Sequence, residues 1–406
     1  MAACRYITDI RNKLWTKASC RLISICLILT PQYVEMLMNI KNYIKIALLF
    51  LITSCGSENG NNNQDSNPTP PIAQGTRVLG LDVKEVPSVT YALAYDQAIT
   101  LGVREVSVSL DWSILEPTTG NYDKTLPDII DAFYPIQTGD LTLVLRPLDT
   151  PGPSLPAGLT GLAYDDPAVI SAFLNFLTNL HNRLPNLNAS GRLKWIHVGN
   201  EVDAYLGSDT ARWAQWNVFF NAAKTRIESL WGTSVEVSSI IQFSALSNTA
   251  THNLYLNLLP QLDSAALTYY PLNADFTMRP PSTVTTDFNF MVNNIPGKSI
   301  LLQECGYPSS TVNNSSETLQ ADYVSAVFDA WDKHIDRIHL IDFAWQYDVS
   351  MSKVDQWVID FGMTGQPNEN IFRQYLATLG LSNYDSSEKV ALQRLREELQ
   401  ARGWVQ

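Results

Sequence analysis

The chain has 406 residues, of which 45% are hydrophobic and 17% charged, and this composition excludes a disordered or fibrous protein for most of its length. The length allows one large α/β domain of roughly 250–300 residues or two medium ones. With a formal net charge of −12, the chain is a poor candidate for binding nucleic acid, which demands a basic face. No run of 18 or more apolar residues occurs, which argues against an ordinary membrane-spanning helix.

The start of the chain has the features of an export signal. Residues 38–55 place two lysines ahead of an apolar run (46–52) that is too short to span a bilayer. The run ends in Ile-Thr-Ser followed by Cys55, and this ending resembles a bacterial lipobox, in which the cysteine is lipidated and becomes the mature N-terminus. We therefore expect residues 1–55 to be a lipoprotein signal segment, with Met38 as the true start. A plain secretory signal with a chance cysteine is the alternative.

The next segment, residues 56–74, is rich in Asn, Ser, Gly and Pro and is predicted to be a flexible linker. With lipid on Cys55, the protein would be anchored to the cell envelope without spanning a membrane. Residue 56 is Gly rather than the Asp that often retains lipoproteins in the inner membrane, so the outer membrane or cell surface is favoured. Beyond this segment only Cys305 remains, which excludes an internal disulfide and a cysteine-based metal site.

The body, residues 75–383, alternates strand and helix patterns eight times. The predicted strands are 78–82, 105–110, 141–146, 193–199, 235–240, 265–270, 299–303 and 338–343. Between them lie helical patterns with apolar residues three to four apart, as in 167–184 and 317–334. Eight units close a (β/α)8 TIM barrel. A doubly wound open sheet is the alternative, but no glycine-rich phosphate turn follows the first strand. Residues 384–406 are predicted to be a C-terminal helix packed outside the barrel.

Two predicted strands end in an acidic residue, at the face where barrel enzymes place their chemistry. The fourth strand is followed by Asn200 and Glu201, and the seventh ends at Glu304. Strands four and seven lie on opposite sides of a barrel mouth, so the two carboxylates can face each other. Glycoside hydrolysis needs such a pair, because one carboxyl must be protonated to help the leaving oxygen depart while the other is ionised. A separation of about 5–5.5 Å gives retention of configuration, and a wider one gives inversion.

This pattern resembles glycoside hydrolase clan A, the 4/7 superfamily of retaining (β/α)8 enzymes. Three further stretches are similar to clan segments, namely DWSILEPTTGNYD (111–123), LTYYPL (267–272) and FAWQYD (343–348). The resemblance implies that Glu201 is the acid/base, that Glu304 is the nucleophile and that Asn200 holds the sugar 2-hydroxyl. Families 5, 39 and 53 are the most similar in pattern, which leaves the substrate open.

The resemblance also implies residues that bind substrate. Trp345 would form the floor of the glycosyl subsite. A clan tyrosine contacts the nucleophile; only one of the consecutive Tyr269 and Tyr270 can point inward, and Tyr270 is favoured because it lies at the strand end. Tyr270 or Arg146 would orient the nucleophile, although clan members often carry an Arg at the end of the second strand and Arg146 ends the third. A structural bridge to the acids of the barrel is the alternative for this arginine, and core packing is the alternative for Trp345.

Two more side chains are candidates for binding sugar. Trp112 would stack on a sugar face, and His197 lies on the same side of its strand as Glu201. Packing for Trp112 and a hydrogen-bonded core histidine for His197 are the alternatives. The five histidines show no metal-binding spacing, so no metal and no organic cofactor are expected.

The sequence therefore predicts a monomeric retaining glycoside hydrolase that cleaves a β-linked poly- or oligosaccharide by double displacement. Its partners would be a carbohydrate substrate and, through the lipid anchor alone, a membrane. Two alternatives remain open: a barrel that binds carbohydrate without cleaving it, and a different barrel hydrolase or surface interaction protein.

Overall fold

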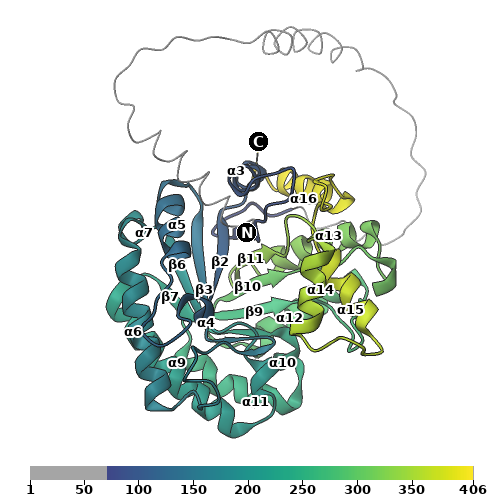
Figure 1. Ribbon diagram of the computed structural model, residues 1–406. Coiled ribbons are helices and arrows are strands. Elements are labelled where there is room, and N and C mark those ends of the chain that lie inside the picture. The colour runs from purple at the N-terminus through teal and green to yellow at the C-terminus, as the bar shows by residue number, and fades with distance from the viewer. Residues whose placement is uncertain (1–70, 406) are drawn as a thin grey trace, which may run out of the picture. The chain divides into compact units, whose positions relative to one another are not determined.

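A computed structural model of the protein describes residues 71–405. Its strands form one sheet in the order β7-β6-β3-β2-β1-β11-β10-β9-β8, with every neighbouring pair parallel (Figure 1). The strands are β1 (Val78–Leu81), β2 (Glu105–Asp111), β3 (Asp140–Arg146), β6 (Leu193–Val198), β7 (Glu236–Ser238), β8 (Ile240–Gln242), β9 (Ala265–Tyr269), β10 (Ile300–Cys305) and β11 (Ile338–Phe343). A small antiparallel pair, β4 (Leu148–Asp149) and β5 (Gly152–Pro153), follows β3.

The barrel is nearly closed, and the expected (β/α)8 fold is confirmed. The two ends of the strand order, β7 and β8, are separated along the chain by Ser239 alone, so together they act as the fifth strand. Val202 donates its backbone N–H to the carbonyl of Ile240 at 3.1 Å, and Ile240 donates to Gly199 at 3.3 Å. These bonds join the fourth and fifth strands near the edge where the sheet order ends.

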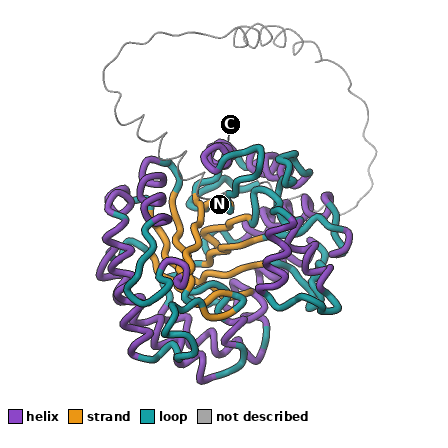
Figure 2. The backbone as a smooth tube through the Cα atoms, in the orientation of Figure 1, coloured by secondary structure: helices purple, strands orange, loops and turns teal. Residues whose placement is uncertain are grey.

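Helices surround the strands (Figure 2). They are α3 (Tyr91–Leu101), α4 (Trp112–Leu115), α5 (Thr125–Phe133), α6 (Pro167–Arg183), α7 (Pro185–Ser190), α8 (Asp203–Leu206), α9 (Thr210–Trp231), α10 (Phe243–Ser247), α11 (Thr249–Leu258), α12 (Val284–Asn294), α13 (Glu317–Lys333), α14 (Met351–Asp360), α15 (Glu369–Ala377) and α16 (Val390–Ala401). Their starts follow capping rules: Asp166 caps α6 ahead of Pro167, and Ser316 caps α13.

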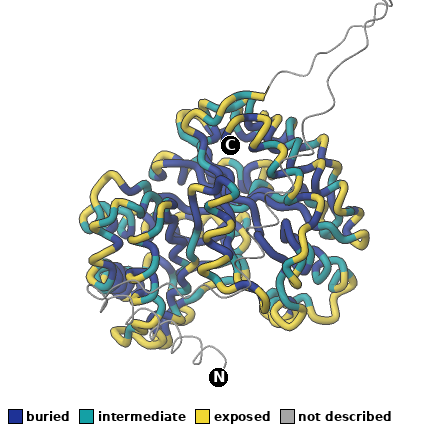
Figure 3. The backbone as a smooth tube through the Cα atoms, turned by 90° about the horizontal axis from the view of Figure 1, so that it is seen from above, coloured by how far each residue is buried: buried dark blue, intermediate teal, exposed yellow. Residues whose placement is uncertain are grey.

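The strands are buried on both faces, as a parallel sheet covered by helices requires, and the outer turns of the helices are exposed (Figure 3). The inside of the barrel also holds a polar layer. Glu105 at the start of β2 and Asp342 on β11 are both buried there, on either side of Gly80. A side chain at Gly80 would collide with both carboxyl-bearing residues, so this position needs glycine.

The C-terminal helix packs on α13 and belongs to the same compact unit as the barrel. Leu395 and Leu399 of α16 are fully buried in the main core. The predicted signal segment, Cys55 and the linker up to residue 70 lie outside the described residues. Among the helices that the structure does describe, none has the length and apolar character needed to cross a membrane.

Candidate active site

The turn after β6 places Glu201 at the mouth of the barrel. Gly199 adopts φ +81°, and a side chain there would come within 2.7 Å of the Trp216 ring, so only glycine fits. Glu201 itself adopts φ +44°, a left-handed conformation that is uncommon for a residue with a side chain. Such conformations cost roughly 1–3 kcal/mol and cluster at functional sites. The turn therefore holds this carboxylate in a position that ordinary strand geometry would not give.

Three donors from three segments fix the Glu201 carboxylate. Thr268 on β9 donates to Oε1 at 2.6 Å. Thr150, between β4 and β5, donates to Oε2 at 2.8 Å, and the side-chain amide of Gln242 on β8 donates to the same oxygen at 3.0 Å. Burial raises the pKa of Glu201, and the three donors oppose that rise because they stabilise the charged form.

Glu304 lies on β10, the seventh barrel strand, and accepts a hydrogen bond from Tyr270. The Tyr270 hydroxyl donates to Oε2 of Glu304 at 2.7 Å. Burial, followed by the negative charge of Glu201, raises the pKa of Glu304 to about 8. Thr268, which donates to Glu201, is the sheet partner of Glu304 on the neighbouring strand, so the two carboxyls lie near each other. Tyr269 points the other way, and its hydroxyl donates to Asp287 at 2.8 Å.

Asn200 and Arg146 are joined through Asp149. The side-chain amide of Asn200 donates to Asp149 at 3.0 Å, while its buried Oδ1 has no hydrogen-bond partner. Arg146 ends the third strand and pairs with Asp111 at 2.9 Å and with Asp149 at 3.3 Å. The guanidinium thus spans two acids near the site. Of the two groups expected to orient Glu304, Tyr270 is the one that contacts it, and the contacts of Arg146 match the alternative of a structural bridge between acids.

Trp345 follows β11 and forms an apolar wall at the same end of the barrel. Trp345 is 9% exposed, and the centre of its ring lies 5.4 Å from the ring centre of Trp357 on α14. The ammonium of Lys84 lies 4.7 Å from the centre of the Trp345 ring and 2.7 Å from the Asp82 carboxylate. A cation therefore covers part of the aromatic surface that was expected to face a sugar.

Trp112 and His197 are core residues, which corrects the expectation that they touch substrate. Trp112 is 0% exposed, and its indole N–H donates to Glu116 at 2.7 Å while its ring packs on Phe173. His197 is also 0% exposed and is hydrogen-bonded to Gln303 at 2.9 Å. Burial lowers the pKa of His197 to about 4, so it is neutral at physiological pH.

The structure adds residues that the sequence did not suggest. Tyr375 on α15 is buried against Tyr270, with ring centres 5.6 Å apart, and the negative charges of Glu201 and Glu304 contribute to its raised pKa. Thr268 could have been predicted from the sequence, because it lies two residues before Tyr270 and alternate residues of a strand share one face. Gln242 lies two residues past the predicted end of the fifth strand. Nothing in the sequence links the helix of Tyr375 to the site.

Within residues 71–405, no three His, Cys, Asp or Glu side chains are placed to hold a metal ion.

Comparison with known proteins shows which solved structures share this fold. No family model matches the chain. No curated protein matches it either. Among solved structures, a variant of GH5_18 from Streptomyces cattleya in complex with Manβ1-4GlcNAc is similar, with a TM-score of 0.59 and 18% identity over 80% of each chain. The fold is that of clan A glycoside hydrolases.

Two further structures of this clan are similar. The exo-β-1,4-mannosidase from Opitutaceae bacterium strain TAV5 has a TM-score of 0.58 and 17% identity over 83% of this chain and 62% of that one. The GH53 catalytic domain from Ignisphaera aggregans has a TM-score of 0.52 and 15% identity over 74% of this chain and 87% of that one. The structural neighbours of this clan A fold are thus glycoside hydrolases.

Proposed function

We propose that the protein is a retaining β-glycosidase. One observation carries the proposal: Thr268 on β9 donates to the Glu201 carboxylate and is also the sheet partner of Glu304 on β10, so the two buried carboxyls at the ends of the fourth and seventh strands lie on either side of one residue. A buried carboxyl pair with one member protonated and the other ionised would provide the acid and the nucleophile that glycoside hydrolysis needs. The likeness of the fold to solved glycoside hydrolases supports the same conclusion.

The reaction has two steps in this proposal. In the first, Glu201 gives its proton to the glycosidic oxygen while a carboxylate oxygen of Glu304 bonds to the anomeric carbon, so that the bond to the leaving group breaks. In the second, Glu201 takes a proton from water as that water attacks the anomeric carbon and displaces Glu304. The sugar leaves with its original configuration, and both carboxyls return to their starting state.

The surrounding groups each support one of these steps. Thr150, Gln242 and Thr268 hold the Glu201 carboxyl in place through both proton transfers. Tyr270 orients Glu304. The unpartnered Oδ1 of Asn200 is an acceptor buried at the mouth, and a sugar hydroxyl would satisfy it.

We infer that β-mannosides are the first substrates to test. Support comes from two structural neighbours, one solved in complex with Manβ1-4GlcNAc and the other described as an exo-β-1,4-mannosidase. A panel of mannan, galactan, xylan and mixed-linkage glucan, with manno-oligosaccharides added, should be assayed for released reducing ends. Release from none of them, at any pH between 5 and 8, would contradict the glycosidase proposal.

The decisive variant is Glu304→Ala. It should abolish turnover, and added azide should restore cleavage and give a glycosyl azide of inverted configuration, because a small anion fills the space of the lost nucleophile. The matched control is Glu317→Ala, which removes a carboxyl at the start of α13 and should keep wild-type activity. Turnover that survives Glu304→Ala would remove the assignment of nucleophile.

A carbohydrate-binding barrel without catalysis is the second candidate, and one observation favours it. A pKa of about 8 leaves Glu304 mostly protonated at neutral pH, whereas a nucleophile must be ionised. Binding of the same glycans should be measured beside reducing-end release. Binding without release by the wild-type protein, together with unchanged binding by Glu304→Gln, would support this candidate.

We also propose that the protein is a lipoprotein of the cell envelope, modified at Cys55. The support is the sequence Ile-Thr-Ser-Cys after a short apolar run. Metabolic labelling with a palmitate analogue in a bacterial host should label the wild-type protein and not Cys55→Ala. Equal labelling of the two would exclude modification at this position.

A further inference from the structure

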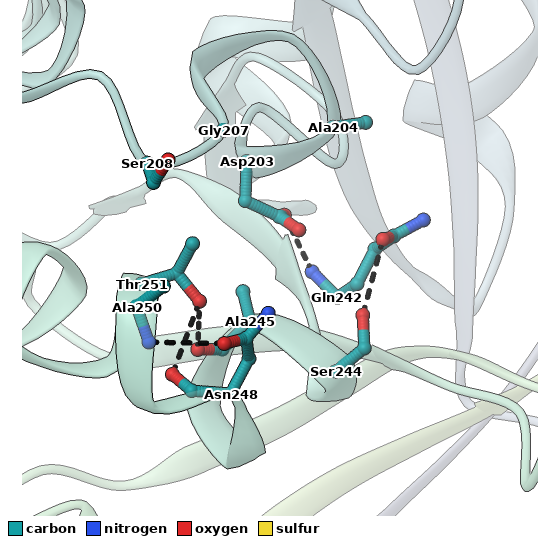
Figure 4. A pocket seen from close by; sticks show the side chains of 10 residues that line it. All are labelled: Asp203, Ala204, Gly207, Ser208, Gln242, Ser244, Ala245, Asn248, Ala250 and Thr251. Atoms are coloured by element: carbon teal, nitrogen blue, oxygen red, sulfur yellow. Dashed lines mark hydrogen bonds between the residues drawn. The ribbon is translucent and has the colours of Figure 1, made fainter. Parts of the chain in front are cut away.

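A pocket of about 290 Å³ lies between α8 and the pair α10 and α11, and Gln242, which contacts Glu201, is part of its lining (Figure 4). Asp203, Ala245 and Thr251 are buried at its base, and Ser208, Ser244 and Asn248 are exposed at its rim. The volume is at the small end of the roughly 300–1,000 Å³ that small-molecule sites span, which suits one sugar unit rather than a long chain.

Gln242 connects this pocket to Glu201. Its side-chain amide donates to the Glu201 carboxylate at 3.0 Å, and its backbone N–H donates to Asp203 at 2.8 Å. Ser244 at the rim donates to the Gln242 carbonyl oxygen at 3.2 Å. The pocket therefore begins one side chain away from the carboxyl that is proposed to protonate the departing oxygen. A leaving group is released on the side of its proton donor, so it has to pass close to Gln242.

The groups that line the pocket suit hydroxyls rather than an apolar ring. None of its ten lining residues is aromatic, so it offers no stacking surface. The side-chain oxygen of Asn248 caps α11 by accepting from the backbone N–H of Ala250. The side-chain N–H groups of Asn248 therefore stay available as donors. Asp203 accepts from the Gln242 backbone N–H through one carboxyl oxygen, and among the described residues no hydrogen bond is made to its other oxygen (Figure 4).

Asp203 is a titratable group that the proposed mechanism does not use. Burial, and to a smaller extent the charge of Glu201, raises the pKa of Asp203 to about 8. At neutral pH this carboxyl is therefore mostly neutral, so it can both donate and accept a hydrogen bond without burying a charge against a neutral ligand. A sugar hydroxyl offers the matching donor and acceptor.

We propose that this pocket is the leaving-group subsite and that it binds one hydroxyl-rich sugar unit on the far side of the bond that is cleaved. This inference rests on the proposed glycosidase function. It assigns Asp203, Asn248 and Ser244 as the residues that recognise the departing sugar, and Gln242 as the residue that joins this subsite to Glu201. The enzyme would then prefer glycans with a sugar leaving group over substrates that release a small ion.

Ala250→Trp tests the proposal by filling the pocket from its exposed rim. The matched control is Ala211→Trp, because both alanines are exposed second residues of helices and both donate their backbone N–H to the capping side chain. The substrates are β-1,4-linked disaccharides of mannose, glucose, galactose and xylose, each paired with the β-glycosyl fluoride of the same sugar. The fluorides need no leaving-group subsite, because fluoride departs as a small ion.

Ala250→Trp should lower kcat/KM for the disaccharide by about tenfold or more and change kcat/KM for the matching fluoride less than about twofold. Ala211→Trp should leave both values unchanged. Asp203→Asn should reproduce the selective loss on the disaccharide. Equal effects of Ala250→Trp on both substrates, or no effect on either, would overturn the subsite while the glycosidase proposal stands. A wild-type protein inactive on all eight substrates would overturn both.

Discussion

At the scale of single residues, we expect the paired carboxyls to set the pH range of the proposed reaction. Burial raises the pKa of Glu201 and the pKa of Glu304, that of Glu304 to about 8. Because the two carboxyls interact, they titrate as a pair, and the working state of the proposed reaction carries one proton on that pair. We expect kcat to fall at alkaline pH, where the pair has lost this proton, and a pH–rate profile on the best glycan checks it. A rate that stays constant to pH 10 would contradict the need for one protonated carboxyl.

Two adjacent tyrosines offer a matched pair of variants. Tyr270→Phe removes the hydroxyl that stabilises the ionised Glu304, so kcat should fall by roughly tenfold or more while the protein stays folded. Tyr269→Phe removes a buried hydroxyl that donates to Asp287 at 2.8 Å, so it should lower the free energy of unfolding by about 1–3 kcal/mol and leave kcat near wild type. Steady-state kinetics and chemical denaturation of both variants check this. A loss of kcat in Tyr269→Phe, with kcat unchanged in Tyr270→Phe, would contradict the assignment of Tyr270 as the group that orients Glu304.

At the scale of elements, the strand pattern could be predicted and the site only in part. Burial on both faces makes the strands apolar and easy to find, so their ends, and with them Glu201 and Glu304, follow from the sequence. The fifth strand breaks at Ser239, and Gln242 beyond it was therefore missed. Tyr375 lies on a helix far along the chain, and only the packing of α15 brings it to Tyr270. Contacts of this kind depend on tertiary structure, which local pattern does not encode.

The polar layer inside the barrel makes a prediction about strands β2 and β11. Burial raises the pKa of Glu105 on β2 to about 7, from an ordinary value of 4.5, beside the equally buried Asp342 on β11. The folded protein therefore holds more protons than the unfolded chain between these values, and its stability must fall as pH rises from about 4.5 to about 7.

Glu105→Gln should flatten that fall, because the amide carries no charge at any of these pH values. Chemical denaturation at pH 5, 6 and 7 measures the slope, which for one such group amounts to a loss of about 3 kcal/mol across the window. Glu85→Gln, at an exposed position after β1, is the control and should keep the wild-type slope. An unchanged slope in Glu105→Gln would mean that this carboxyl is ionised in the folded protein.

At the scale of the whole molecule, ion pairs to one shared carboxylate hold the two ends of the described chain together. Arg77, just before β1, pairs with Asp332 on α13 at 2.6 Å, and Arg402, after α16, pairs with the same carboxylate at 2.8 Å. The Arg77 guanidinium also lies about 5 Å from the rings of Trp331 and Trp404. Residues 384–405 therefore contribute to the stability of the barrel, although the sequence pattern alone predicts only an outer helix there.

A buried ion pair joins the start of this C-terminal segment to the loop after β11, which also contains Trp345. The Lys389 ammonium lies 2.7 Å from the Asp348 carboxylate, and both side chains are almost fully buried. Lys389→Met keeps the length of the side chain but leaves Asp348 without its cation, so the free energy of unfolding should fall by about 3–5 kcal/mol. Lys353→Met, at an exposed position on α14, should change the free energy of unfolding by less than about 0.5 kcal/mol.

Because most of the cost comes from the uncompensated carboxylate, the double variant Lys389→Met with Asp348→Asn should recover part of the loss in chemical denaturation at pH 7. A double variant no more stable than Lys389→Met alone would show that the lysine stabilises the segment by packing instead of by charge.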